Sequence, residues 1–229
     1  IARKNNMLFI MDAVTSIGGD DVRTDGWEVD ICITGSQKCL GAPPGLGFAA
    51  VSERAWNVIE NNSGKRGFYL DLASYRKSLK KSTTPFTPAL SLIYGLRVAL
   101  AELRAEGLEN RIRRHRMLAA ATREAALAMN LELFADPTHA SNTVTAIKIP
   151  VGLTDSDVRG RLKDEYGILL AGGQESVKGK IFRIGHMANV DNVELLGVLS
   201  ALEMVLARAG HDFTLGAGVS AAQSRLSSL

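Results

Sequence analysis

Three short apolar runs, each followed by turn-forming residues, organise the first part of the chain. They are Met7-Leu8-Phe9-Ile10-Met11, which ends at Asp12, then Asp30-Ile31-Cys32-Ile33-Thr34, and Gly47-Phe48-Ala49-Ala50-Val51. A continuous apolar run of this length is typical of a strand buried in a parallel sheet. Glycines and prolines between the runs indicate connecting loops. We therefore predict an α/β region built on parallel strands.

Two long helices are predicted in the middle of the chain. Apolar residues recur at helical spacing from Ser91 to about Glu106, and a second helix is expected from about Leu108 to Met129. Gly107 between them is a plausible hinge, which predicts one domain over residues 1–107 and a second over 108–229. The basic stretch Arg111–Arg116 is interpreted as a solvated helix face.

The last hundred residues predict a smaller α+β domain. The expected order is a strand over Thr143–Ile149, a helix from Thr154 to Tyr166, strands over Ile168–Leu170 and Ile181–Ile184, and a helix from Asp191 to Arg208. The tail after Gly210 is rich in small and polar residues, and we expect it to pack peripherally.

Composition excludes several classes of protein. The 27 basic and 24 acidic residues give a net charge of +3, too weak to indicate a nucleic-acid or membrane surface. The sequence contains no run of eighteen apolar residues, the length that a helix needs to span a bilayer. Two cysteines do not make a disulfide framework, which suits a cytoplasmic protein. Because the chain opens at Ile1 without Met, signal peptide or N-cap, we expect it to be part of a longer polypeptide.

Lys38 is the first candidate for chemistry. It follows the apolar run that stops at Gly35-Ser36 and precedes an apolar loop rich in Gly and Pro. Burying an ammonium is costly, and a desolvated lysine has a lowered pKa that makes its neutral amine nucleophilic toward a carbonyl. The alternative is a lysine at a strand end whose ammonium reaches out to solvent.

Asp12 strengthens the functional interpretation. It ends the first strand, so it is expected at the same sheet edge as Lys38, where ligands bind in open parallel sheets. A lysine that forms a Schiff base and an acid that keeps a pyridine nitrogen protonated are what pyridoxal 5'-phosphate (PLP) requires. The alternatives for Asp12 are a helix N-cap or a salt bridge with Lys38.

Four motifs in order resemble the class V aminotransferases, which are PLP enzymes of fold type I. The similarity is greatest to the alanine–glyoxylate and serine–glyoxylate aminotransferases, and it runs from residue 1 to about residue 210. The motifs are Met11-Asp12-Ala13-Val14-Thr15-Ser16, Thr34-Gly35-Ser36-Gln37-Lys38 with Pro43-Pro44-Gly45, Thr84-Pro85-Phe86-Thr87-Pro88, and Lys180-Ile181-Phe182-Arg183-Ile184-Gly185-His186-Met187.

The resemblance implies part of a mostly parallel PLP-binding sheet domain and a transamination between a small amino acid and an oxo acid such as glyoxylate or pyruvate. It also implies a homodimer with sites shared across the interface. By that resemblance, the residue roles are Lys38 as the Schiff-base lysine, Asp12 as the partner of the pyridine nitrogen, Val14 against one face of the ring, Gln37 on the cofactor phosphate, Thr87 (with Thr84 less strictly) on the phosphate of the neighbouring subunit, and Arg183 on the substrate carboxylate.

Other interpretations stay open beside this one. Without the resemblance, Arg183 would be interpreted as part of a structural ion pair. A carbon–sulfur lyase or cysteine desulfurase is the nearest enzymatic rival, although Cys39 is interpreted as a buried apolar cysteine. A non-catalytic partner subunit is the third, because the phosphate-binding loop and the ring-stacking residue are not in this sequence. They are expected from the same or a second chain. The histidines show no metal-ligand spacing, so no metal is predicted.

Overall fold

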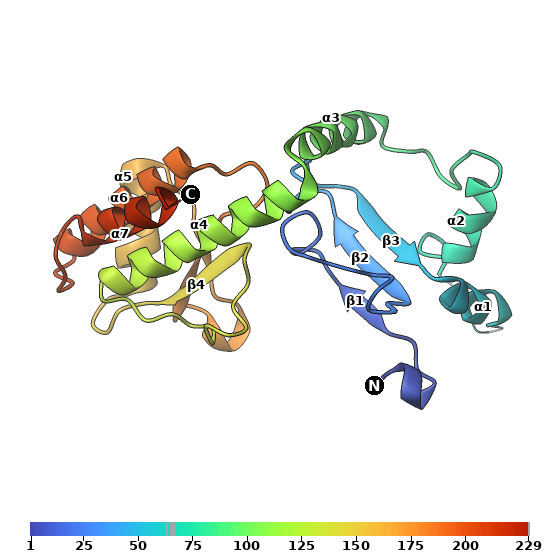
Figure 1. Ribbon diagram of the computed structural model, residues 1–229, viewed down its shortest axis with the longest axis horizontal. Coiled ribbons are helices and arrows are strands. Elements are labelled where there is room, and N and C mark those ends of the chain that lie inside the picture. The colour runs from blue at the N-terminus through green and yellow to red at the C-terminus, as the bar shows by residue number, and fades with distance from the viewer. Residues whose placement is uncertain (63, 65–66, 229) are drawn as a thin grey trace. The chain divides into compact units, whose positions relative to one another are not determined.

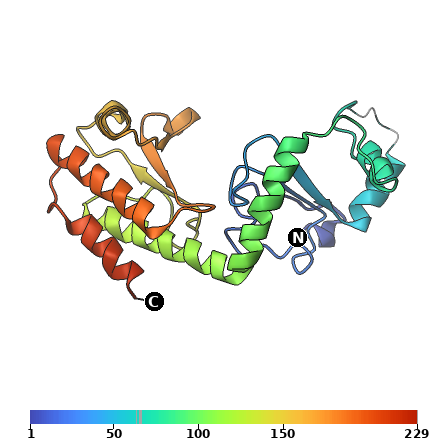
Figure 2. The same cartoon turned by 90° about the horizontal axis from the view of Figure 1, so that it is seen from above.

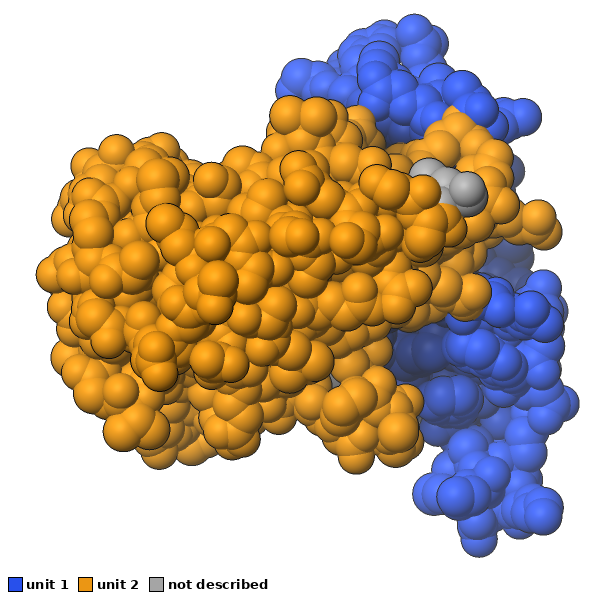
Figure 3. Space-filling view, turned by 60° about the vertical axis from the view of Figure 1, so that its left-hand side comes forward, with its two compact units in different colours: residues 1–17, 21–105 blue, residues 18–20, 106–229 orange. Residues whose placement is uncertain are grey.

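The computed structural model describes residues 1–62, 64 and 67–228. The chain divides into two compact units, residues 1–17 with 21–105 and residues 18–20 with 106–229 (Figure 3). The units meet in sequence between Ala105 and Glu106, at the end of a helix. That residues 1–107 form a cofactor-binding domain and 108–229 a small domain stays a prediction.

The first unit contains a three-stranded mixed sheet in the order β1-β2-β3 (Figure 1). Strand β1 (Ile10–Asp12) runs parallel to β2 (Ile31–Gly35), and β3 (Gly47–Val51) runs antiparallel to β2. The α/β class is confirmed, but of the two strand pairs described here only one is parallel. The short connection from β2 to β3 explains the antiparallel pair, because a parallel neighbour needs a longer crossover.

The first strand was predicted to be buried, and this part of the prediction was wrong. Ile10 is 58% exposed and Met7, just before the strand, is 51% exposed. Within the described residues β1 has a strand neighbour only on its β2 side. Apolar side chains therefore lie uncovered along this edge of the sheet.

Three helices follow the sheet. They are α1 (Glu53–Asn61), α2 (Leu72–Leu79) and α3 (Leu90–Glu106). The Ser52 hydroxyl caps α1 by accepting the Ala55 N–H at 3.1 Å, and the same hydroxyl donates to buried Asp30 at 3.0 Å. Burial alone would raise the pKa of Asp30. The Phe9 N–H, the Ser52 hydroxyl and the Arg54 charge together hold that pKa below its ordinary value.

The second unit contains an antiparallel sheet in the order β4-β6-β5, covered by helices. Its strands are β4 (Val144–Lys148), β5 (Ala171–Gly172) and β6 (Ile181–Gly185). Its longer helices are α4 (Leu108–Ala128), α6 (Asn192–Arg208) and α7 (Ala217–Leu226), which pack together (Figures 1 and 2). A π-helical turn (Ser156–Gly160) leads into the short helix α5 (Arg161–Tyr166). Phe182 and Leu202 are fully buried in the core between sheet and helices.

Two predictions for this unit were wrong in detail. Ile168–Leu170 is not a strand; the strand is the next pair of residues, β5. The tail after Gly210 is not merely peripheral, because α7 packs on α4 and buries Ala222. The buried carboxylate of Glu203 starts α7 by accepting backbone N–H groups, including that of Gly218 at 2.7 Å.

The prediction that Arg111–Arg116 is a solvated helix face was also wrong in part. Arg111 is 2% exposed and pairs with Glu106 at 2.8 Å, and Arg114 pairs with the same carboxylate at 2.7 Å. Hydrogen bonds from Arg114 and Arg111 outweigh desolvation and hold the pKa of Glu106 below its ordinary value. Only Arg113 and Arg116 of this stretch are exposed arginines.

His186 lies fully buried after β6, with its Nε2 2.9 Å from the Thr145 hydroxyl. Burial, reinforced by the nearby His115 and by the Arg123 charge, lowers the pKa of His186 to about 4. The ring is therefore neutral in the folded protein, and the unfolded chain binds one proton more between its ordinary pKa and pH 4. Stability is lost as the pH falls through that window.

We expect His186 to lower the free energy of unfolding by about 2 kcal/mol when the pH falls from 7 to 5. Urea denaturation of the wild type and of His186→Gln at both pH values measures the difference. The variant loses less stability on acidification, whereas the control His139→Gln, at an exposed site, behaves as the wild type does. Equal pH dependence in all three proteins would contradict the assignment.

Candidate functional site

The parallel pairing of β1 with β2 brings Asp12 and the turn that carries Lys38 to the carboxyl ends of these two strands, which lie at one edge of the sheet. The register places Asp12 opposite Ile33, so both strands end at this edge. β2 ends at Gly35, and the turn carrying Gln37 and Lys38 follows directly. The prediction that Asp12 and Lys38 share a sheet edge agrees with this topology.

Hydrogen bonds hold the segment after β1 against the segment after β2. The Ala13 N–H donates to the Ile33 carbonyl at 2.8 Å, and the buried Thr34 hydroxyl donates to the Ala13 carbonyl at 3.3 Å. The Cys39 thiol donates to the Thr15 carbonyl at 3.1 Å. Half-buried Val14 is therefore carried by a backbone that is fixed on both sides of it.

Asp12 is exposed, and its own backbone orients its carboxylate. Oδ1 accepts the Val14 N–H at 2.9 Å, which is a local turn bond and not the cap of a long helix. Among the described residues no cation pairs with Asp12, and Oδ2 accepts no hydrogen bond. The negative charge of Asp12, together with burial as the larger cause, raises the pKa of the Cys32 thiol. Asp12 therefore has one carboxylate oxygen, Oδ2, without a hydrogen-bond partner among the described residues.

The Lys38 turn is closed by buried Ser36. The Ser36 N–H donates to the Leu46 carbonyl at 3.0 Å and the Ser36 hydroxyl to the Pro43 carbonyl at 2.6 Å. The Gly41 N–H donates back to the Lys38 carbonyl at 2.9 Å. The backbone of Lys38 is thus fixed from both sides, which a nucleophile or a covalent anchor requires.

The Lys38 side chain is half-buried, and no carboxylate in the described part of the chain pairs with its ammonium. The alternative of an Asp12–Lys38 salt bridge is therefore not realised. Gln37 is exposed and folds back over Gly35, where a Cβ would lie 2.9 Å from the Gln37 Oε1. A side chain at Gly35 would thus displace the amide that the resemblance assigns to a phosphate.

Thr87 and Thr84 lie in the segment before α3, and both are exposed. The Thr84 hydroxyl donates to the Phe86 carbonyl at 2.7 Å. No hydrogen bond within the described residues joins Thr87 to Asp12 or Lys38. The structure therefore leaves the Thr87 hydroxyl available at the surface of the unit.

Arg183 belongs to the second unit and is considered separately from Lys38. It lies on β6, half-buried, and its Nε donates to the Gly172 carbonyl at 3.0 Å. No described carboxylate pairs with it, so the alternative of a structural ion pair does not hold here. An arginine with its Nε held and its terminal nitrogens unpaired can bind a carboxylate through both of them.

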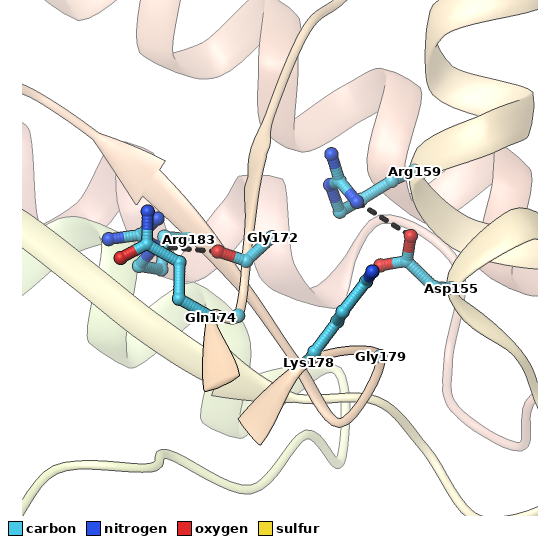
Figure 4. Close-up of a pocket in the computed structure, with 8 residues that line it drawn as sticks. Asp155, Arg159, Gly172, Gln174, Lys178, Gly179 and Arg183 are labelled. Carbon is cyan, nitrogen blue, oxygen red and sulfur yellow. Dashed lines mark hydrogen bonds and ion pairs between the residues drawn. The ribbon is translucent and has the colours of Figure 1, made fainter. Parts of the chain in front are cut away.

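Arg183 opens onto a pocket of about 490 Å³ in the second unit (Figure 4). The remaining lining residues come from the π-helical turn with the residue before it and from β5 with the segment after it, and they are Asp155, Arg159, Gly172, Gly173, Gln174, Lys178 and Gly179. Three cations and one carboxylate line this pocket, which favours an anionic ligand.

Cys39 does not have the environment of a sulfur-transferring cysteine. It is fully buried, and its thiol is engaged with the Thr15 carbonyl. Both cysteines are free and buried. The described residues contain no cluster of His, Cys, Asp and Glu that could hold a metal, and no helix among them is long and apolar enough to cross a membrane.

Several residues that shape the site were missed from sequence. Thr34 and Ser36 signalled only a strand end, although both are buried and hydrogen-bonded. Arg159 was also missed, although its spacing of four residues from Asp155 is typical of a helical ion pair; its second partner is the backbone carbonyl of Leu170. A polar residue directly at the end of an apolar run is the signal that could have pointed to Thr34 and Ser36.

Comparison with known proteins gives a consistent result. Residues 1–193 match the family model described as Aminotransferase class-V. An uncharacterized aminotransferase of Methanocaldococcus jannaschii is 49% identical over 93% of this chain and 55% of its own length. A protein of a Synechococcus strain named as the small subunit of a soluble hydrogenase is 47% identical, over 96% and 57%. The serine–glyoxylate aminotransferase of Arabidopsis thaliana is 40% identical, over 97% and 56%.

A solved structure agrees over almost the whole chain. The ureidoglycine–glyoxylate aminotransferase of Bacillus subtilis superimposes with a TM-score of 0.93 at 34% identity, covering 99% of this chain and 59% of that one. The chain spans about half the length of the curated relatives it matches. On the match of residues 1–193 and the identity of these relatives, the chain belongs to the class V aminotransferase family.

Proposed function

We propose that the whole protein is a PLP-dependent transaminase that moves an amino group between a small amino acid, of the alanine or serine type, and an oxo acid such as glyoxylate or pyruvate. One observation carries the proposal. The parallel pair β1–β2 presents an unpaired carboxylate, Asp12, and an ammonium without a carboxylate partner, Lys38, at the same sheet edge. Family membership and the names of the relatives support the reaction class.

The residues present fit PLP by their chemistry. When bound, PLP supplies an electron sink that weakens the Cα–H bond of an attached amino acid. Lys38 would hold the cofactor covalently through Nζ, and as a free amine the same atom would accept and return the proton of the substrate Cα. The Asp12 oxygen without a hydrogen-bond partner would accept the N–H of the protonated pyridine nitrogen.

The other roles follow the same chemistry. Val14 would pack on the ring, since its backbone is fixed by the hydrogen bonds that the Ala13 and Thr15 carbonyls accept. Gln37 would donate an amide N–H to the phosphate without adding a charge beside Lys38. Arg183 would bind the substrate carboxylate through its two terminal nitrogens.

We further propose a cytoplasmic homodimer in which Thr87 reaches the cofactor phosphate of the partner subunit. Thr87 is exposed, and apolar side chains on α3, the helix that follows it, are uncovered, among them Leu90 at 59% and Val98 at 59% exposed. The phosphate-binding loop and the ring-stacking residue come from the same polypeptide or from a second one. Free, buried cysteines support a reducing compartment.

A second candidate is a subunit that assembles without catalysing. It is favoured by the relative named as a soluble hydrogenase subunit, which matches 96% of this chain. The two candidates differ in one property, because only the transaminase requires a covalent bond between Lys38 and PLP.

Replacing Lys38 separates the two candidates. In the whole protein, Lys38→Ala lowers transaminase activity on the order of 10³-fold or more and removes the visible absorbance band of bound PLP. Lys38→Arg keeps the charge and is equally inactive, whereas the exposed control Lys77→Ala is unaffected. If wild type and Lys38→Ala are equally colourless after incubation with PLP, the cofactor proposal fails.

Replacing Arg183 tests the substrate site. Arg183→Ala raises KM for the amino acid roughly 100-fold, because a charge-assisted bidentate contact is lost, while the PLP absorbance is kept. Arg183→Lys recovers only part of the affinity, since an ammonium cannot bind both carboxylate oxygens in one plane. Unchanged kinetics in Arg183→Ala, measured with a panel of donors against glyoxylate and pyruvate, would remove the carboxylate role.

A further inference from the structure

We propose that Arg159, oriented by Asp155, is a positioning residue for Arg183. In this arrangement Arg159 fixes the edge strand β5, and the Gly172 carbonyl of that strand fixes the guanidinium that binds the substrate carboxylate. The inference rests on the proposed role of Arg183 as the carboxylate ligand. Arg159 itself touches neither substrate nor cofactor in this scheme.

Strand β5 depends on side chains for its position. It consists of Ala171–Gly172 only, lies at the edge of the sheet and pairs with β6 alone. One further backbone bond, from the Gly173 N–H to the Ile181 carbonyl at 3.0 Å, continues the ladder. So short an edge strand has few backbone bonds to hold it, and contacts at its outer side decide where it lies.

Arg159 supplies such a contact from the π-helical turn Ser156–Gly160. Its Nε donates to the Leu170 carbonyl, the residue before β5, at 2.8 Å. Its Nη1 pairs with Asp155 Oδ2 at 2.6 Å across one turn. The other oxygen of Asp155 is enclosed and has no hydrogen-bond partner among the described residues. Asp155 is thus committed to Arg159, and both side chains are about one-third exposed.

Gly172 shows how closely Arg159 lies against the strand. A Cβ at Gly172 would be 2.7 Å from Arg159 Nη1 and 3.0 Å from its Cζ. A side chain at Gly172 would therefore require the Arg159 guanidinium to move away from the backbone at this point. Arg159 therefore contacts the chain just before β5, at the Leu170 carbonyl, and β5 itself, at Gly172.

Arg183 contacts the same residue from the opposite face of the sheet. Arg183 lies opposite Ala171 in the ladder, so their side chains share a face, and the missing side chain of Gly172 would point to the other one. Figure 4 shows Gly172 between the two guanidinium groups. The Gly172 carbonyl accepts Arg183 Nε at 3.0 Å, so a shift of β5 moves the acceptor that orients Arg183.

The charges are consistent with this division of roles. Asp155 neutralises Arg159, whereas no described carboxylate pairs with Arg183. Arg159 is therefore a poor ligand for an incoming anion, and Arg183 remains able to bind one. With Nε held by the backbone, Arg183 presents Nη1 and Nη2 to a carboxylate in a fixed plane.

The test uses variants of the whole protein with PLP bound. Arg159→Ala raises KM for both amino donor and oxo acid roughly tenfold or more, with kcat and the PLP absorbance little changed. Arg159→Lys, which can still donate to the Leu170 carbonyl, recovers part of the loss. The control Arg161→Ala, at the first residue of α5, leaves KM unchanged.

Two further measurements distinguish a positioning role of Arg159 from a general loss of folded structure in the variant. The Arg183 Nε–H resonance, observed by NMR with labelled arginine, exchanges slowly in the wild type and rapidly in Arg159→Ala. Gly172→Ala, which displaces the guanidinium without removing a charge, gives the same rise in KM and the same loss of protection. It also serves as the test if Arg159→Ala does not fold.

The double variant Arg159→Ala/Arg183→Ala has the KM of Arg183→Ala alone, because Arg159 acts only through Arg183. Additive effects, or an unchanged KM and Nε–H exchange in both Arg159→Ala and Gly172→Ala, would overturn the inference. If Arg183→Ala raises KM and these variants do not, the inference fails and the proposed function stands. If Arg183→Ala itself leaves KM unchanged, the carboxylate role of Arg183 fails and this inference fails with it, whereas the transaminase proposal is decided by Lys38→Ala.

Discussion

The parallel pairing of β1 with β2 is the constraint on which the candidate site depends. It places the ends of both strands at one sheet edge, and with them Asp12 and the turn of Lys38. Hydrogen bonds from Thr34 and Cys39 then tie the segment after Asp12 to the segment that carries Lys38. These contacts all use backbone carbonyls as acceptors, so the geometry of the site is built into the chain path.

In the second unit, fewer backbone hydrogen bonds position the candidate side chain. Its carboxylate-binding candidate, Arg183, takes its orientation from the carbonyl of Gly172 on a two-residue edge strand. Arg159 holds that strand from the other face, and Asp155 holds Arg159. Both units therefore orient a charged side chain by first fixing a stretch of backbone, in the second unit through the ion pair of Arg159 with Asp155.

What could be predicted from sequence was local. Apolar runs that stop at Asp12 and before Lys38 predicted the strands and their common edge, and helical spacing predicted α3 and α4 to within a residue or two. The shared edge needed only the rule that parallel strands end together. The family resemblance, which the comparisons confirm, then attached roles to those residues that spacing alone could not.

What could not be predicted depends on tertiary contacts that residue spacing does not show. Arg111 was expected in solvent, but Glu106 and Asn189 hold it in the interior. Helix α7 was missed because its small residues carry a weak helical pattern, and its start is set by Glu203. The predicted burial of β1 was wrong because a run of apolar residues does not show whether a neighbouring element covers it.

Borohydride reduction of the PLP-treated whole protein, followed by proteolysis and peptide mass mapping, tests the central claim most directly. The account predicts one covalent pyridoxyl group, on the peptide that contains Lys38, because this lysine is held at the sheet edge beside Asp12 without a competing carboxylate. A reduced protein without that group, or with it on a different lysine, would contradict the account.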